Sequence, residues 1–155
     1  MTVQLTQKER LLLEDQKSHE EICVEKYTSY AEQAEDEQLK QLFTSYAQQE
    51  QQHLDSVNQM LSGQIPSTQN QQGGQQKAQN QQLKPTGASG SQKDAKLCND
   101  MLMTEKYVSG TYDTAVFEFQ DTNMRKTLNH IQKEEQQHGE GIFNYMVQNG
   151  MYQPK

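Results

Sequence analysis

The stretch Glu50-Gln51-Gln52-His53 occurs a second time as Glu135-Gln136-Gln137-His138. The second copy begins 85 residues after the first, at position 135 instead of 50, and the same offset continues without a gap far outside the tetrapeptide. It relates Asp15 to Asp100, Glu20 to Glu105, Tyr27 to Tyr112, and Asp36 to Asp121. A repeat of this length predicts two copies of one structural unit, here a helical hairpin.

The residues that the two copies share are mostly acidic residues, histidine and tyrosine, whereas repeats kept only for packing would share apolar residues. In each copy a glutamate precedes Glu-x-x-His by thirty residues: Glu20 precedes Glu50 and His53, and Glu105 precedes Glu135 and His138. A glutamate from each of two helices and Glu-x-x-His from each of two others form the ligand set of a two-metal carboxylate site in a four-helix bundle.

Composition limits the function classes. The 155 residues suit one domain with a single core, which we expect to cover residues 1–155. The net charge of −7 disfavours nucleic acid and anionic membranes as partners, and no apolar run is long enough to span a bilayer. Residues 1–6 do not resemble a signal peptide, so synthesis in the cytosol is expected. Cys23 and Cys98 fit neither a disulfide framework nor a CxxC metal clip and are expected to be thiols of the core.

Apolar periodicity and capping residues predict helices and no strand. The expected helices cover about 7–35, 37–62, 94–120 and 122–150, which gives helical hairpins at about 7–62 and about 94–150. Thr6 with Glu9 is typical of a capping box, Asp36 can cap the second helix, and Asp121 or Thr122 can cap the fourth. Gly63 suits the end of the second helix.

Residues from about 63 to 93 are rich in Gln, Gly, Ser and Asn. They have almost no apolar side chains and are expected to be flexible. A helix of about 27 residues is ~40 Å long, a distance that this stretch can span. It therefore suits a connection between the far ends of the two hairpins. The predicted fold is an all-α four-helix bundle with one long crossover between its second and third helices.

Helical angle predicts which side chains face the interior. The six candidate ligands lie in the middle of the apolar stripes: Glu20, Glu50, His53, Glu105, Glu135 and His138. Glu21 and Glu25 point elsewhere, and Glu134 lies at the edge of its stripe, so they are weaker candidates. His19 and His130 lie outside the stripes and are expected to be solvated.

Four buried carboxylates require compensating charge, because each unpaired one costs several kcal/mol. Two divalent cations would supply four positive charges against the four glutamates. The i, i+3 spacing in Glu-x-x-His places an oxygen and a nitrogen where one ion can bind both. Hard oxygen donors with one imidazole per metal favour iron or manganese, with zinc as an adventitious occupant.

Tyr27 and Tyr112 lie two turns beyond Glu20 and Glu105 on the same faces. Two interpretations remain open for them. They are either core tyrosines whose hydroxyls bond to any buried partner, or residues that hydrogen-bond to the carboxylates of the metal ligands and so support the reacting centre.

The ligand pattern resembles the ferritin-like superfamily, which includes bacterioferritins, rubrerythrins and manganese catalases. Residues from about 95 to 155 also resemble the spore coat protein F family, through Leu102-Met103-Thr104-Glu105-Lys106-Tyr107-Val108-Ser109-Gly110-Thr111-Tyr112-Asp113-Thr114-Ala115 and Phe143-Asn144-Tyr145-Met146-Val147-Gln148-Asn149-Gly150-Met151-Tyr152. The first hairpin resembles only the ferritin-like pattern. No four-cysteine rubredoxin module follows the fourth helix. Leu102 stands where rubrerythrins carry a further glutamate, which disfavours rubrerythrin-type peroxidase chemistry.

These resemblances imply a ferritin-like bundle in which Glu20, Glu50 and His53 hold one ion, the equivalent residues hold the other, and carboxylates bridge. They also imply synthesis in the mother cell and assembly into the spore coat, with other coat proteins and a second copy of the chain as candidate partners. One hypothesis is a coat protein whose dinuclear centre reacts with peroxide or oxygen. The alternative is a purely structural coat component with a vestigial site. An iron-storing ferritin fits least well, and whether the chain is an enzyme stays open.

Overall fold

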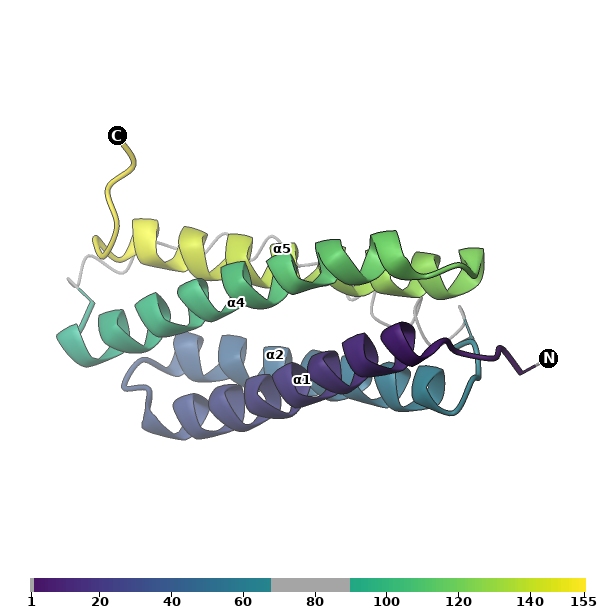
Figure 1. The fold of residues 1–155 in the computed structure, drawn as a ribbon. Coiled ribbons are helices and arrows are strands. Elements are labelled where there is room, and N and C mark those ends of the chain that lie inside the picture. Colours follow the sequence, from purple (N-terminus) through teal and green to yellow (C-terminus); the bar gives the residue numbers. More distant parts are fainter. Residues whose placement is uncertain (1, 68–89) are drawn as a thin grey trace.

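The computed structural model describes residues 2–67 and 90–155, and this part of the chain contains helices and no strand. Its helices are α1 (Gln7–Gln33), α2 (Glu37–Leu61), α4 (Gln92–Glu118) and α5 (Thr122–Gln148). The hairpins α1/α2 and α4/α5 lie against each other as a four-helix bundle (Figure 1). The predicted all-α bundle is confirmed, with helix ends within a few residues of those expected.

Local capping explains where the helices begin and end. Thr6 and Glu9 form the predicted capping box at α1. The side chains of Asp36 and Asp121 cap α2 and α5, so Asp121 rather than Thr122 is the cap of α5. Gly63, just after α2, has φ of +77°, a left-handed conformation that glycine adopts without strain.

The start of α4 differs from the expected one, because this helix begins at Gln92 and not near Asp94. Ser91 is the cap, and its hydroxyl accepts a hydrogen bond from the Asp94 backbone N–H. The buried Asp94 carboxylate instead accepts hydrogen bonds from the backbone N–H groups of Glu35 and Asp36, at 2.8 and 3.0 Å. Asp94 therefore ties its own helix to the α1/α2 turn.

A corresponding hydrogen bond from a turn to a buried carboxylate occurs at the other end of the bundle. The buried Glu9 carboxylate accepts from the Gln120 backbone N–H at 2.9 Å, in the turn between α4 and α5. Glu9 and Asp94 are related by the repeat offset, as are Glu35 and Gln120. Each hairpin thus fastens the turn of the other in the same way, as approximate two-fold symmetry requires.

The described ends of the connection between the hairpins lie at opposite ends of the bundle. At the end of α2, the Gly63 carbonyl accepts from the Val3 N–H at 2.7 Å, near the start of the chain. Just before α4, the Gly90 N–H donates to the Asn149 carbonyl at 3.1 Å, at the opposite end (Figure 1). This is the predicted long crossover. Most of the stretch expected to be flexible, residues 68–89, lies outside the described residues, and Lys93 belongs to α4.

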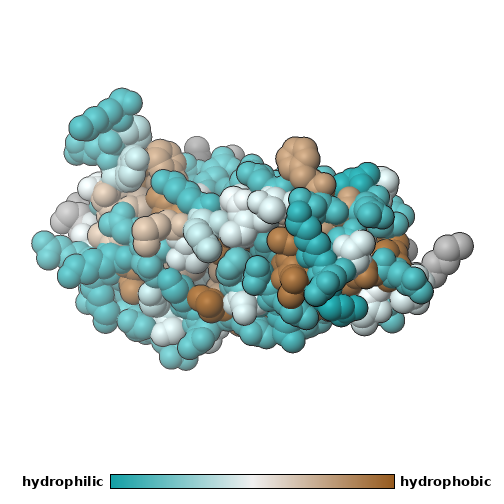
Figure 2. Space-filling model, in the orientation of Figure 1, coloured by the Kyte–Doolittle hydropathy of each residue, from teal (hydrophilic) through white to brown (hydrophobic). Residues whose placement is uncertain are grey.

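The core consists of two apolar clusters with a polar layer between them. One cluster lies near the N-terminal end of α1 and includes Leu13, Val57, Met124 and Leu128. The other includes Leu39, Phe43, Met101 and Ile142. Cys23 and Cys98 are buried and unbonded, as expected. The visible surface is mostly hydrophilic with separate hydrophobic patches (Figure 2). Among the described helices, none has the length and apolarity to cross a bilayer.

Candidate metal centre

The polar layer in the middle of the bundle contains all six predicted ligands, and each is at most 3% exposed. Each helix contributes to it. Their ligand atoms form two overlapping groups, within each of which the atoms lie within 4.8 Å of one another: Glu20, Glu50, His53 and Glu135 in one, and Glu50, Glu105, Glu135 and His138 in the other. Glu50 and Glu135 belong to both groups, which is the position of bridging carboxylates.

Both imidazoles turn Nδ1 toward the shared carboxylates. His53 Nδ1 lies 3.1 Å from Glu50 Oε2 and 3.1 Å from Glu135 Oε1. His138 Nδ1 lies 2.9 Å from Glu50 Oε1 and 3.6 Å from Glu135 Oε2. Each shared carboxylate therefore offers one oxygen to each half of the site. Glu20 and Glu105 lie on one side each, at 3.8 Å from His53 Nδ1 and 3.3 Å from His138 Nδ1.

Three carboxylate oxygens of this layer are buried without a hydrogen-bond partner: Glu20 Oε2, Glu105 Oε2 and Glu135 Oε2. An unsatisfied buried acceptor of this kind costs about 1–3 kcal/mol, and more when it is charged. A cation between the carboxylates would satisfy all three. The donor set of hard oxygens with one imidazole on each side therefore fits two divalent ions.

The crowding of carboxylates changes the acidity of the layer. Burial, together with repulsion by Glu135, raises the pKa of Glu20 well above its ordinary value and raises the pKa of Glu105 to about 7. Burial also favours a neutral Glu50, but hydrogen bonds from His138 and His53 lower the pKa of Glu50 to about 2. These pKa shifts favour protonated outer glutamates and a charged Glu50 in the metal-free site.

The two histidines complete this arrangement. Burial by itself lowers the pKa of His53 and His138, yet hydrogen bonds to the surrounding carboxylates raise both well above the ordinary value. Without an ion, protonated imidazoles supply the positive charge of the layer. An ion that binds Nδ1 must displace these protons, so metal and protons compete for the same site.

This competition predicts opposite pH dependence for the two forms. Glu105 has a folded pKa of about 7 against an ordinary 4.5, and the histidine pKa values are raised too, so these groups stabilise the metal-free fold at low pH. That contribution is lost as pH rises from about 4.5 through 7 and beyond. The melting temperature of metal-free protein should therefore fall between about pH 5 and pH 8, whereas metal-loaded protein should gain stability as competing protons leave. Parallel slopes for the two forms would contradict this competition.

Tyr27 and Tyr112 cross the bundle to the ligands of the other hairpin. The Tyr27 hydroxyl donates to Glu105 Oε1, and the Tyr112 hydroxyl donates to Glu20 Oε1. Burial raises the pKa of both phenols well above its ordinary value, so both remain donors. Of the two interpretations, the geometry favours contact with the ligand carboxylates: each tyrosine fixes the orientation of one outer glutamate.

Replacing either tyrosine with phenylalanine should weaken metal binding without removing a ligand. The loss of an outer hydrogen bond of this kind typically costs about 10–100-fold in metal affinity. Tyr27→Phe should act mainly on the ion beside His138 and Tyr112→Phe on the ion beside His53, which isothermal titration can resolve as two unequal steps. Tyr107→Phe is the control, because Tyr107 is 65% exposed. Affinities equal to the parent would assign Tyr27 and Tyr112 to packing alone.

The outer nitrogens of the imidazoles have partners of their own: Glu134, which was expected only as a weaker ligand candidate, and Gln49, which the sequence did not single out. His53 Nε2 lies 3.4 Å from Glu134 Oε1, and His138 Nε2 lies 2.5 Å from Gln49 Oε1. Glu134 and Gln49 are related by the repeat offset, which is the signal that could have revealed them. An acceptor at Nε2 holds the proton there and leaves Nδ1 for a metal.

Glu134 lies at the edge of its stripe, as expected: its side chain is 13% exposed, and it contacts His53 without belonging to either ligand group. One expectation about the neighbours needs correction, namely that His130 and His19 are solvated. His130, expected to be solvated, pairs with Glu134 at 2.6 Å because one helical turn separates them on α5, and its side chain is 31% exposed. His19 is partly buried against Tyr107. Glu21 and Glu25 are exposed, as predicted.

Comparison with known proteins relates the second hairpin to a family of described proteins. Residues 93–155, which contain α5 and all of α4 except Gln92, match the family model described as Coat F domain. No curated protein and no solved structure matches the chain. The matched region includes Glu105, Glu135 and His138, whereas the first hairpin, with Glu20, Glu50 and His53, lies outside it.

Proposed function

We propose that this protein is a spore coat protein whose bundle holds two divalent metal ions, iron or manganese, in a carboxylate-bridged centre of ferritin-like type. The location in the coat is supported by the Coat F match over residues 93–155. The metal centre is supported by one observation above all. Four glutamates and two histidines converge in a buried layer, and three of the carboxylate oxygens there lack any hydrogen-bond partner.

The residues have distinct roles in this proposal. Glu20 with His53 and Glu105 with His138 would hold one ion each, and Glu50 and Glu135 would be shared between the two ions. Tyr27 and Tyr112 orient the outer carboxylates, and Glu134 and Gln49 orient the imidazoles. When bound, iron or manganese would supply redox chemistry toward peroxide or oxygen. The apolar clusters cover the layer toward the two ends of the bundle.

Metal analysis and a peroxide assay test the metal centre, and detection in spore fractions tests the location in the coat. Protein purified without added metal should contain iron or manganese, and protein loaded with two equivalents should consume peroxide faster than the Glu50→Ala variant under the same conditions. Antibodies to the chain should detect it in the coat fraction of purified spores. Absence from that fraction would contradict the location, and equal peroxide consumption by parent and variant would contradict the redox role.

A purely structural coat component is the second candidate. It is favoured by the hydrogen bonds that already join His53 to Glu50 and Glu135 and join His138 to Glu50, because protons can partly satisfy the layer. In that case the protein would assemble into the coat equally well with Glu50 and Glu135 replaced. If the variants with Glu50 or Glu135 replaced fail to assemble while the parent assembles, this candidate is excluded.

A further inference from the structure

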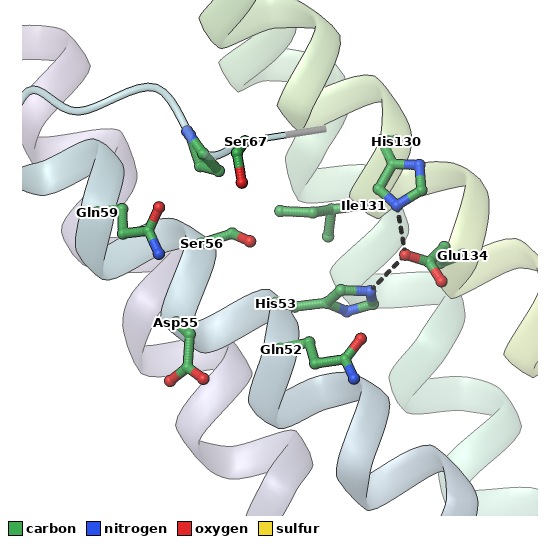
Figure 3. Close-up of a pocket in the computed structure, with 10 residues that line it drawn as sticks. Gln52, His53, Asp55, Ser56, Gln59, Ser67, His130, Ile131 and Glu134 are labelled. Atoms are coloured by element: carbon green, nitrogen blue, oxygen red, sulfur yellow. Dashed lines mark hydrogen bonds and ion pairs between the residues drawn. The ribbon is translucent and has the colours of Figure 1, made fainter. Parts of the chain in front are cut away.

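A cavity of about 230 Å³ lies beside one half of the candidate metal centre, between α2, α5 and the segment with Pro66 and Ser67 that follows α2. His53 lines it, with Gln52, Ser56 and Gln59 from the same helix and His130, Ile131 and Glu134 from α5 (Figure 3). The 3% exposed His53 turns Nε2 toward Glu134, which in turn contacts the partly exposed His130. The cavity thus leads from the side of the bundle to a predicted ligand.

The other half of the centre is closed at the corresponding place. The repeat offset relates Ile131 of the cavity to Tyr46. The Tyr46 ring stacks on His138 with centroids 4.3 Å apart. Its hydroxyl lies against Gly141, where an added Cβ would come within 1.8 Å of the Tyr46 oxygen. On the cavity side the smaller Ile131 faces Ser56, the counterpart of Gly141, and space remains.

The polar side chains at this place also differ between the two halves of the centre. Glu134 and His130 of the cavity correspond to Gln49 and Ser45 in the closed half. A carboxylate and an imidazole replace a neutral amide and a hydroxyl on the open side only. A cleft with a fixed negative charge concentrates cations, and carboxylate oxygen with imidazole nitrogen is a donor pair for divalent metals. The cavity therefore suits a divalent cation on its way to the buried layer.

We propose that this cavity is the route by which divalent cations enter the centre, through the His53 half, with Glu134 and His130 as the first side chains that a cation meets. The proposal rests on the proposed metal centre and adds a direction to it. Tyr46 seals the His138 half, so the ion beside His138 is loaded through the same opening. The asymmetry has a clear consequence: variants at repeat-related positions should differ in loading rate.

The first test gives the cavity side the two residues that close the His138 side, a glycine and a tyrosine at the repeat-related positions. The double variant Ser56→Gly/Ile131→Tyr should fill the cavity as Tyr46 does beside Gly141. Stopped-flow absorption with Co²⁺ as the probe should show several-fold slower loading than in the parent, while the final spectrum still reports two equivalents. Ser56→Gly alone is the control for the cost of glycine in a helix. Equal rates in the double variant and the parent would overturn the proposal.

The second test removes the charge of Glu134 without changing the shape of the cavity. It applies even if the first double variant does not fold. Glu134→Gln copies Gln49, which still accepts a hydrogen bond from its imidazole, and should slow Co²⁺ loading by about tenfold at low salt. Glu140→Gln is the matched control, because Glu140 is exposed on α5 at the repeat position of the cavity residue Asp55. Equal slowing in both variants would overturn the entry route. Failure of the parent to bind Co²⁺ at equilibrium would refute the metal centre itself and the route with it.

Discussion

Replacing Glu50 or Glu135 with alanine should remove more than one equivalent of metal, although each variant lacks a single carboxylate. Both residues belong to both groups of ligand atoms, so either loss takes an oxygen from each ion. The repeat makes the two lesions near-equivalent. Glu20 and Glu105 belong to one group each, and Glu20→Ala or Glu105→Ala should mainly weaken the ion on its own side.

Equilibrium dialysis at limiting metal concentration measures these stoichiometries. Glu21→Ala is the matched control, since Glu21 is an exposed neighbour of Glu20 on the same helix. It should bind like the parent. If Glu50→Ala and Glu20→Ala lose equal amounts of metal, Glu50 does not bridge. If every variant matches the parent, these glutamates are not ligands and the structural role is the better account.

Removal of metal should lower the melting temperature strongly at neutral pH. The layer contains four buried glutamates whose repulsion is relieved only by cations or protons. Ligand at a hundredfold excess over its Kd stabilises a fold by about 2.7 kcal/mol per site. In a chain of this size about 1 kcal/mol shifts the melting temperature by ~2–4 °C, so two sites should shift it by about 10–20 °C.

Differential scanning calorimetry of chelator-treated and reloaded protein checks this shift. The double variant Glu50→Ala/Glu135→Ala should show little change on addition of metal, because it lacks both bridges. Equal melting temperatures of the parent with and without metal, once the metal content has been verified, would contradict a metal centre that couples to folding.

Much of this site was predictable, because in a helix the sequence spacing of two residues determines whether their side chains share a face. Glu50 and His53 are three residues apart and therefore share a face, and the repeat supplies the same pair on α5. The helix caps were also predictable, since the side chains of Thr6, Asp36 and Asp121 accept hydrogen bonds from backbone N–H groups in the first turn of their own helices. These features depend on local geometry alone.

Other features depend on contacts between helices that no local pattern encodes. That Glu50 and Glu135 are the carboxylates shared by both groups follows from the approach of α2 to α5. The pairing of Glu134 with His53 and the cavity beside Ile131 arise at the same interface. Ser91 was missed as the cap of α4 because it stands in a stretch where Ser, Gly and Gln are common.

Anomalous X-ray diffraction from crystals grown with Mn²⁺ tests the central claim most directly. The account predicts two anomalous peaks in the middle of the bundle, about 3.5–4 Å apart as in other two-metal sites. One peak should lie beside His53 Nδ1 and the other beside His138 Nδ1, with Glu50 and Glu135 contacting both. Manganese found only at surface carboxylates, with no peak in the buried layer, would contradict the account.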